Sequence, residues 1–170
     1  MTRIHFAPLE TTAIQQLIEV AHRAWHAHYP GIISVEQIDY MLQLCYNPTV
    51  ITHEIRDQGI IWLTIMDETT MIGFLSVGPH DTSTVKLHKL YLLPEYHGKG
   101  IGSLALAKAE QVALDMEACG MVLNVNKQNH KAIRAYEHSG WRITAELVND
   151  IGNGFKMDDF VMSKQICAPC

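Results

Sequence analysis

The stretch L-H-K-L-Y-L-L-P-E-Y-H-G-K-G-I-G-S, from Leu87 to Ser103, combines the end of a strand, a glycine-rich turn and the start of a helix. Its apolar run, 90–93, predicts a strand that stops at Pro94, because proline cannot donate a hydrogen bond to a sheet. Three glycines follow, and a helix-compatible segment runs from Ile101 to about Met116. Backbone N–H groups at such a helix start favour an anion, and glycines let it approach closely. The stretch therefore predicts a pyrophosphate-binding site.

The glycines Gly98, Gly100 and Gly102 fit neither of two common nucleotide-binding loops. A dinucleotide fold has G-x-G-x-x-G with an acidic residue after the next strand. Here the spacing is G-x-G-x-G, and the next strand ends in Val125-Asn126-Lys127. A P-loop needs G-x-x-x-x-G-K-[ST], which the chain lacks. On these residues alone, a tight turn without a ligand also stays open.

Two blocks of the sequence resemble blocks of the GNAT N-acetyltransferase superfamily. The loop from His97 to Ser103 is similar to its coenzyme A loop, R/Q-x-x-G-x-G/A, and matches it at Gly100 and Gly102. His97 departs from the pattern, which usually has Arg or Gln there. The second block, Asn129-x-x-Ala132-x-x-x-Tyr136-x-x-x-Gly140-Trp141, is similar to N-x-x-A-x-x-x-Y-x-x-x-G-F. The resemblance covers residues 59–165 well and the first 55 or so only loosely.

This resemblance implies an α/β fold of the GNAT type, with a mixed, twisted sheet of six or seven strands and helices on both faces. The central strand and the strand at Met121 are expected to splay apart and admit acetyl-CoA, the co-substrate, and no metal is expected. We expect one N-acetyltransferase domain over residues 1–166 and a disordered tail at 167–170. The expected cofactor contacts are Leu90, Tyr91, Leu92, His97, Gly98, Lys99, Gly100, Ile101, Gly102, Ser103, Asn129, Ala132 and Tyr136.

Tyr136 is the candidate catalytic residue, as a general acid. Attack of an amine on a thioester requires a donor for the oxyanion and a proton for the departing thiolate. On a helix capped by Asn129, residues 129, 132, 133 and 136 share one stripe, and a phenol can supply that proton. Backbone N–H groups of residues 90–92 would serve the acetyl carbonyl if their strand bulges. The spacing alone fits a core tyrosine at position 136 equally well, and the side chains of residues 90–92 alone favour an ordinary core strand.

The general base is left open by the sequence. The neighbourhoods in which some family members place a glutamate offer Lys86, His88 and Asn124 instead. His88 has a suitable intrinsic pKa, but it is one of ten histidines. A chain of water molecules that opens to bulk solvent is therefore the favoured route for the proton.

Two groups of residues are candidates for binding the acceptor. An aromatic cluster at the end of the first long helix suits either stacking on an amine or packing on the sheet; it comprises Trp25, His26, His28 and Tyr29. Three carboxylates flank the final hairpin, and they could either pair with an ammonium group of the acceptor or be ordinary turn and surface side chains. They are Asp150, Asp158 and Asp159. The stretch D-I-G-N-G-F-K-M-D-D-F-V-M, 150–162, is similar to the end of bacterial GNAT proteins that acetylate polyamines and other small amines.

The predicted function is transfer of the acetyl group of acetyl-CoA to a primary amine of a small molecule, with a polyamine as a candidate. Two alternatives stay open: a protein N-terminal or lysine acetyltransferase, and a non-catalytic regulator that binds acyl-CoA. A net charge of −5 argues against nucleic acid and anionic membranes as partners, and the sequence leaves a homodimer open. No apolar run reaches the ~20 residues of a membrane span, and a signal-peptide pattern is absent, so we expect a cytoplasmic protein.

Other patterns predict the remaining elements. A helix capped by Thr11 or Thr12 runs to about Tyr29, and a capping box at Ser34 starts a second helix. A short helical turn follows Thr49. The helix after the glycine turn is expected to bury Leu104, Ala107, Val112 and Ala113. Cys45 and Cys119 are interpreted as core thiols, and the terminal pair Cys167 and Cys170 as part of a tail without a role.

Overall fold

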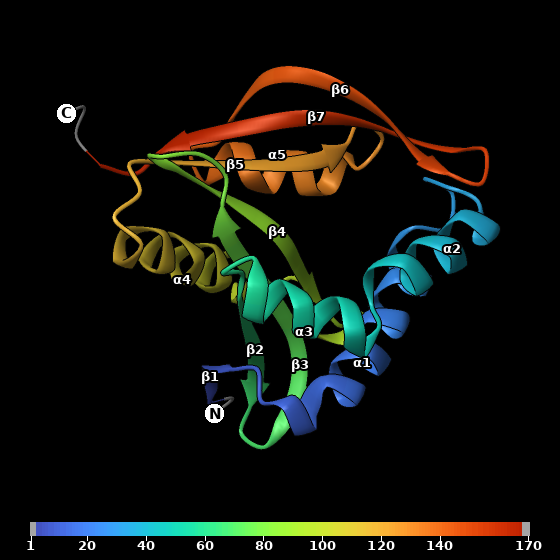
Figure 1. Ribbon diagram of the computed structural model, residues 1–170, viewed down its shortest axis with the longest axis horizontal. Coiled ribbons are helices and arrows are strands. Elements are labelled where there is room, and N and C mark those ends of the chain that lie inside the picture. The colour runs from blue at the N-terminus through green and yellow to red at the C-terminus, as the bar shows by residue number, and fades with distance from the viewer. Residues whose placement is uncertain (1–2, 168–170) are drawn as a thin grey trace.

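The computed structural model describes residues 3–167, which form one seven-stranded sheet with helices on both sides (Figure 1). The strands are β1 (Ile4–Pro8), β2 (Ile61–Asp67), β3 (Thr70–Pro79), β4 (Thr84–Leu92), β5 (Gly120–Asn126), β6 (Arg142–Gly152) and β7 (Phe155–Gln165). The helices are α1 (Ile14–His28), α2 (Val35–Cys45), α3 (Pro48–Asp57), α4 (Ile101–Asp115) and α5 (His130–His138). Short 3-10 turns, η1 (Thr11–Ala13) and η2 (Pro94–Tyr96), precede α1 and follow β4. The α/β architecture predicted from the sequence is confirmed.

The strand order is β1-β2-β3-β4-β5-β7-β6. Every neighbouring pair is antiparallel except β4 and β5, which run parallel. This parallel pair is short, because only Thr84–Lys86 and Gly120–Val122 are matched. Beyond Lys86 the two strands separate, so the splay expected in the middle of the sheet is present.

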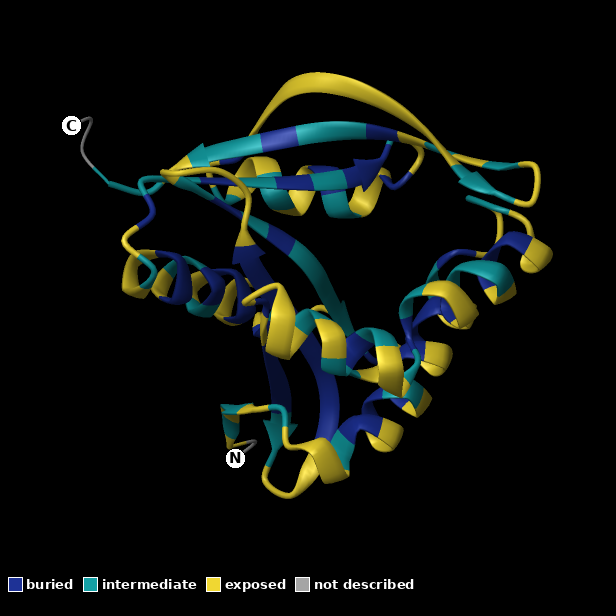
Figure 2. Ribbon diagram, in the orientation of Figure 1, coloured by how far each residue is buried: buried dark blue, intermediate teal, exposed yellow. Residues whose placement is uncertain are grey.

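Two hydrophobic cores lie on opposite faces of the sheet. One packs α4 and α5 against the strands, and the other packs α1, α2 and α3 against the other face. Phe74 and Leu75, neighbours on β3, enter different cores because successive side chains of a strand point to opposite faces. Figure 2 shows the consequence: β2 and β3 are buried through most of their length, whereas β6 is exposed.

The helix starts follow the local sequence only in part. Ser34 caps α2 by accepting a hydrogen bond from the Gln37 backbone N–H at 3.1 Å, as predicted. The Gln37 side chain does not close the capping box; it donates to the Lys156 carbonyl at 2.9 Å instead. Asn47 accepts from the Val50 N–H at 3.0 Å and caps the full helix α3, where only a short turn was predicted. Pro48 at the first position of α3 is compatible with this start.

Two further details of the predicted helices are wrong. The 3-10 turn η1 precedes α1, and the position before each of these elements makes no side-chain capping bond, so neither Thr11 nor Thr12 caps α1. On α4, Leu104 is 53% exposed and Ala107 is exposed as well. The core face of α4 comprises Ile101, Ala105, Leu106, Ala109, Val112 and Ala113. Apolar residues surround most of this helix, so their spacing does not single out one face.

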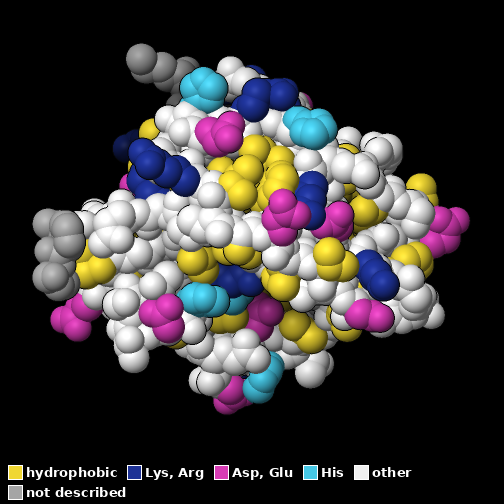
Figure 3. All heavy atoms as spheres, turned by 90° about the horizontal axis from the view of Figure 1, so that it is seen from above, with side chains coloured by type: hydrophobic (Ala, Val, Ile, Leu, Met, Phe, Trp, Pro, Cys, Tyr) yellow, Lys and Arg dark blue, Asp and Glu magenta, His cyan; other side chains and the backbone are white. Residues whose placement is uncertain are grey.

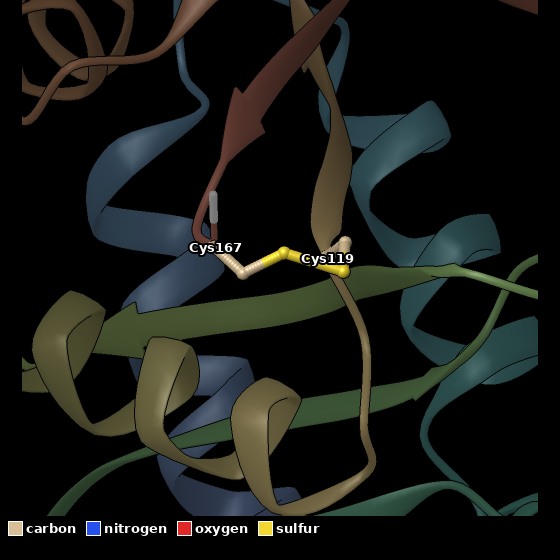
Figure 4. The surroundings of a disulfide bond; sticks show 2 residues. All are labelled: Cys119 and Cys167. Carbon is tan, nitrogen blue, oxygen red and sulfur yellow. A yellow bond between two sulfur atoms is a disulfide. The ribbon is translucent and has the colours of Figure 1, made fainter. Parts of the chain in front are cut away.

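A disulfide joins Cys119, immediately before β5, to Cys167, shortly after β7 (Figure 4). The interpretation of Cys119 as a core thiol and of Cys167 as part of a tail without a role is therefore wrong. Cys170 lies outside the described residues, whereas Cys45 is a free, partly buried thiol. Disulfides persist mainly in oxidising compartments, so the cytoplasmic location stays a prediction.

The edge strand β6 presents apolar side chains to the surface. Ile143, Leu147 and Val148 are 42%, 36% and 59% exposed. Seen from above, hydrophobic side chains on the face that β6 and β7 form are interspersed with charged ones (Figure 3). Exposed edge strands can pair with other strands, which keeps a homodimer among the predictions. Within residues 3–167, no helix has the length and apolarity that a membrane span requires.

Candidate active site

A cleft of about 570 Å³ opens where β4 and β5 separate. Its lining residues come from β4, the glycine turn, β5 and α5, and from α1, α2, β6 and β7. All of the predicted cofactor contacts border this cleft except Lys99 and Ile101. The Lys99 ammonium instead lies 5.0 Å from the centre of the Tyr96 ring, and Ile101 is buried in the core.

Strand β4 carries a β-bulge at the cleft. Ser76 pairs with Lys89 and Val77 pairs with Leu87, so His88 is an extra residue on β4. Because the pairing with β5 stops at Lys86, the edge of β4 that faces the cleft has no strand partner over residues 88–92 within the described chain. Backbone groups on this edge are therefore available to a ligand, which is the condition that the predicted role of residues 90–92 requires.

The glycine turn is open on its outer side. Gly98 and Gly100 have φ values of 73° and 78°, a backbone region that favours glycine, and Gly102 lies in the first turn of α4. A Cβ atom at any of the three would meet no atom within 4 Å. Gly100 provides no side-chain cap, so the first N–H groups of α4 face open space. His97 secures the turn, with Nε2 3.0 Å from the Leu92 carbonyl oxygen.

Tyr136 borders the cleft from α5. The side chain of Asn129 caps this helix by accepting from the Ala132 N–H at 3.3 Å. Asn129, Ala132 and Tyr136 face the cleft, whereas Ile133 is buried in the core. Burial, and to a lesser extent the neighbouring Tyr29, raise the pKa of Tyr136 above its ordinary value. The phenol therefore keeps its proton at neutral pH and is available as a donor.

The aromatic cluster predicted at the end of α1 is divided by the structure. Trp25, His28 and Tyr29 border the cleft, whereas His26 is paired with Asp39 at 3.1 Å. The Tyr29 and Tyr91 hydroxyl oxygens lie 2.9 Å apart, and the ring centres of Trp25 and Tyr29 are separated by 4.5 Å. Burial raises the pKa of Tyr29 to about 12. The cluster thus forms an uncharged aromatic wall.

One of the residues considered as proton acceptors, His88, is poorly suited to that role. Lys86, His88 and Asn124 do border the cleft. Burial, followed by the charge of Lys89, lowers the pKa of His88 to about 4, which makes its imidazole a weak base. Burial also lowers the pKa of His28, so this side chain is neutral at pH 7.

The three carboxylates near the final hairpin have different environments. Asp150 accepts a hydrogen bond from the Gly152 N–H at 2.9 Å inside the turn, and Asp158 forms an ion pair of 2.7 Å with Lys127. Asp159 is 6% exposed and borders the cleft. The alternation of β7 carries a signal for this difference, because Asp159 shares its face with Met157 while Asp158 points to the other side.

Helix α2 lies beside the hairpin of β6 and β7 (Figure 1), and both contribute residues to the lining of the cleft. The Tyr40 hydroxyl donates to the Ile151 carbonyl at 2.7 Å, and its ring centre lies 5.5 Å from that of Phe155. The bond from Gln37 to the Lys156 carbonyl lies in the same contact. The sequence assigned Gln37 to the capping box and did not single out Tyr40, because each of these contacts joins segments more than 100 positions apart.

Residues 12–141 match the model of the Acetyltransferase (GNAT) family. A spermidine N(1)-acetyltransferase of Thermoplasma acidophilum is 31% identical over 144 residues, which cover 82% of this chain and 89% of that protein. An uncharacterized N-acetyltransferase of Mycobacterium tuberculosis is 27% identical over 155 residues, 91% and 99% of the two chains. The crystal structure of PaiA N-acetyltransferase from T. acidophilum with coenzyme A superposes with a TM-score of 0.81 at 27% identity, covering 96% and 99%.

A splayed sheet, a bulged central strand and an uncapped glycine turn define an acyl-CoA-dependent transferase of the α/β class. The chain belongs to the GNAT family of acetyltransferases, and acetyl-CoA is its co-substrate. The resemblance stated from the two sequence blocks is confirmed. Within the described part of the chain, no group of three or more His, Cys, Asp or Glu side chains is arranged to hold a metal ion.

Proposed function

We propose that the protein transfers the acetyl group of acetyl-CoA to a primary amine of a small molecule by direct attack, with Tyr136 as general acid. The observation that carries the proposal is the single cleft in which the glycine turn, the unpaired edge of β4 and Tyr136 meet. The pyrophosphate would lie on residues 98–103, and the pantetheine arm between β4 and β5. Backbone N–H groups of residues 90–92 would then receive the acetyl carbonyl.

The proposed role of Tyr136 is to protonate the coenzyme A thiolate as the C–S bond breaks. A phenol with a raised pKa is a weak acid in water, but a buried cleft penalises the thiolate as well and raises its proton affinity. Asn129 fixes the start of α5, and the Ile133 contact with the core fixes the face that Tyr136 presents. The nitrogen of the tetrahedral intermediate releases the proton that restores the phenol.

A small acceptor fits the part of the cleft beside α2 better than the surface of a folded protein does. The contact of α2 with the β6–β7 hairpin restricts access from this side. A buried carboxylate, Asp159, is compatible with a cationic amine, and the spermidine acetyltransferase among the relatives supports a polyamine as a candidate.

The experiment is a panel of amines assayed by release of free thiol from acetyl-CoA. Spermidine, a simple monoamine, a peptide with one lysine and a peptide with only a free N-terminus separate the candidate classes. We expect kcat/KM to be highest for a small amine. Turnover confined to either peptide would overturn the small-molecule proposal, and binding of acetyl-CoA without turnover of any amine would favour a regulator.

A further inference from the structure

Asp159 is the one carboxylate among the described residues that border the cleft. Its residue is 6% exposed, and its Oδ1 atom has no hydrogen-bond partner within residues 3–167. A buried carboxylate oxygen without a partner destabilises a fold, because it loses its contacts with water and gains nothing in return. Because Asp159 is a residue that borders the cleft, a ligand there can supply the donor that this acceptor lacks.

The partner strand and the neighbouring residue define where this oxygen lies. Asp159 is opposite Asn126 on β5, and both residues border the cleft beyond the point where β4 and β5 separate. Asp158, the preceding residue, points to the other side of β7 and pairs with Lys127. The same strand therefore offers a matched carboxylate that differs chiefly in the face it occupies.

Charged and titratable groups from four segments surround Asp159. They are Asp158 on β7, Lys86 on β4, Lys127 after β5 and Tyr29 at the end of α1. Burial, followed by the charge of Asp158, raises the pKa of Asp159 to about 6, against the opposing effect of the two lysines. Tyr29 also lies near Tyr136, so the carboxylate and the proposed general acid belong to the same part of the cleft.

We propose that Asp159 binds the ammonium group of the acceptor and accepts one of its protons before the attack, an assignment that rests on the proposed acetyl transfer. The ammonium R–NH₃⁺ gives one proton to the carboxylate and becomes R–NH₂. The nitrogen lone pair then forms the C–N bond, and the C–S bond breaks. Tyr136 protonates the thiolate, the nitrogen returns a proton to Tyr136, and Asp159 releases its proton to water. The net products are the amide, free coenzyme A and one proton.

The decisive comparison is between Asp159→Asn and Asp158→Asn, with the amine that the parent acetylates fastest in the panel. General base catalysis contributes about 10²–10⁴-fold, so kcat/KM for the amine should fall at least about 100-fold in Asp159→Asn. The KM for acetyl-CoA should stay near that of the parent. At about pH 8, where Asp159 is ionised in both proteins, Asp158→Asn should retain parent-like kcat/KM, because its carboxylate lies on the other face of β7. An Asp159→Asn variant within about threefold of an active parent would overturn the assignment while leaving the proposed function intact.

Two readouts separate this role from a structural one. In the parent, kcat/KM for the amine should decline below about pH 6, because Asp159 becomes protonated there. The Lys86→Met variant removes a cation that lowers the pKa of Asp159, so this acidic limb of the pH profile should move to higher pH. Calorimetric titration of spermidine into the complex with coenzyme A tests binding without turnover. The Asp159→Asn variant should bind spermidine at least about tenfold more weakly than Asp158→Asn does. Equal affinities of the two variants, or an unmoved acidic limb in Lys86→Met, would overturn the assignment.

Discussion

Replacement of Gly102 by aspartate isolates the electrostatics of the glycine turn from its folding. Gly102 has ordinary helical geometry, and a Cβ atom there meets nothing within 4 Å, so the new side chain fits without a clash. An acidic residue in the first turn favours the helix by about 0.3–1 kcal/mol, and the helix propensity of aspartate is no lower than that of glycine. The melting temperature should therefore stay level or rise.

Coenzyme A binding should move in the opposite direction. A carboxylate about 5 Å from a phosphate charge costs roughly 1 kcal/mol in water and roughly 3 kcal/mol at the effective dielectric constant of a protein surface. The two charges of a pyrophosphate bring the loss to about 2–6 kcal/mol, which raises the Kd at least about 30-fold. Isothermal titration calorimetry with coenzyme A measures this change directly.

The neutral variant Gly102→Asn is the control, because it adds nearly the same bulk without the charge. We expect it to weaken binding much less than Gly102→Asp does. If the aspartate variant is folded and binds coenzyme A within about threefold of the parent, the pyrophosphate does not lie on this turn and the reasoning fails.

Three further predictions concern other parts of the molecule. Tyr136→Phe should lower kcat by about 10²–10⁴-fold with little change in coenzyme A affinity or melting temperature, and a parent-like kcat in a chemistry-limited assay would make this ring a packing residue. Replacement of both Cys119 and Cys167 by serine should lower the free energy of unfolding by about 4 kcal/mol, because the disulfide closes a loop that spans 48 positions. Equal denaturation midpoints of the parent with and without reductant would contradict this prediction. Gly152 has a φ of 91°, and a Cβ atom there would lie 2.6 Å from the Tyr40 hydroxyl. Gly152→Ala should therefore raise the amine KM and lower the melting temperature, and unchanged values would show that the contact of α2 with the hairpin is dispensable.

Local chemistry was sufficient to predict most of the elements. Ser34 and Asn129 act as the caps expected of them, and the turn at Asn153 and Gly154, both with positive φ, joins β6 to β7 as predicted. The start of α3 was missed although its signal, Asn47 followed by proline, lies in the sequence. Family blocks placed Tyr136 and the glycine turn on one cleft, which neither periodicity nor composition could do.

Contacts between distant segments account for what the sequence did not reveal. The pairing of Cys119 with Cys167 depends on β5 and β7 being neighbours, and that order follows from the fold rather than from the spacing of cysteines. Strand alternation puts Asp158 and Asp159 on opposite faces, but only the fold shows that the face of Asp159 borders the cleft. Lys99, one of the expected cofactor contacts, lies beside the Tyr96 ring instead.

The short parallel pairing of β4 and β5 joins the two strands at one end of the cleft only. Only three residue pairs hold the two strands together, and the Cys119–Cys167 bond lies next to them. Beyond the last of these pairs, β5 continues from Val122 to Asn126 over about 13 Å, so a rotation of about 5° at that pair moves Asn126 by about 1 Å relative to β4. That distance separates a hydrogen bond from no bond at all. The covalent link joins β5 to β7 and not to β4, so a change in the angle to β4 carries these two strands together, with Asp159 among their residues.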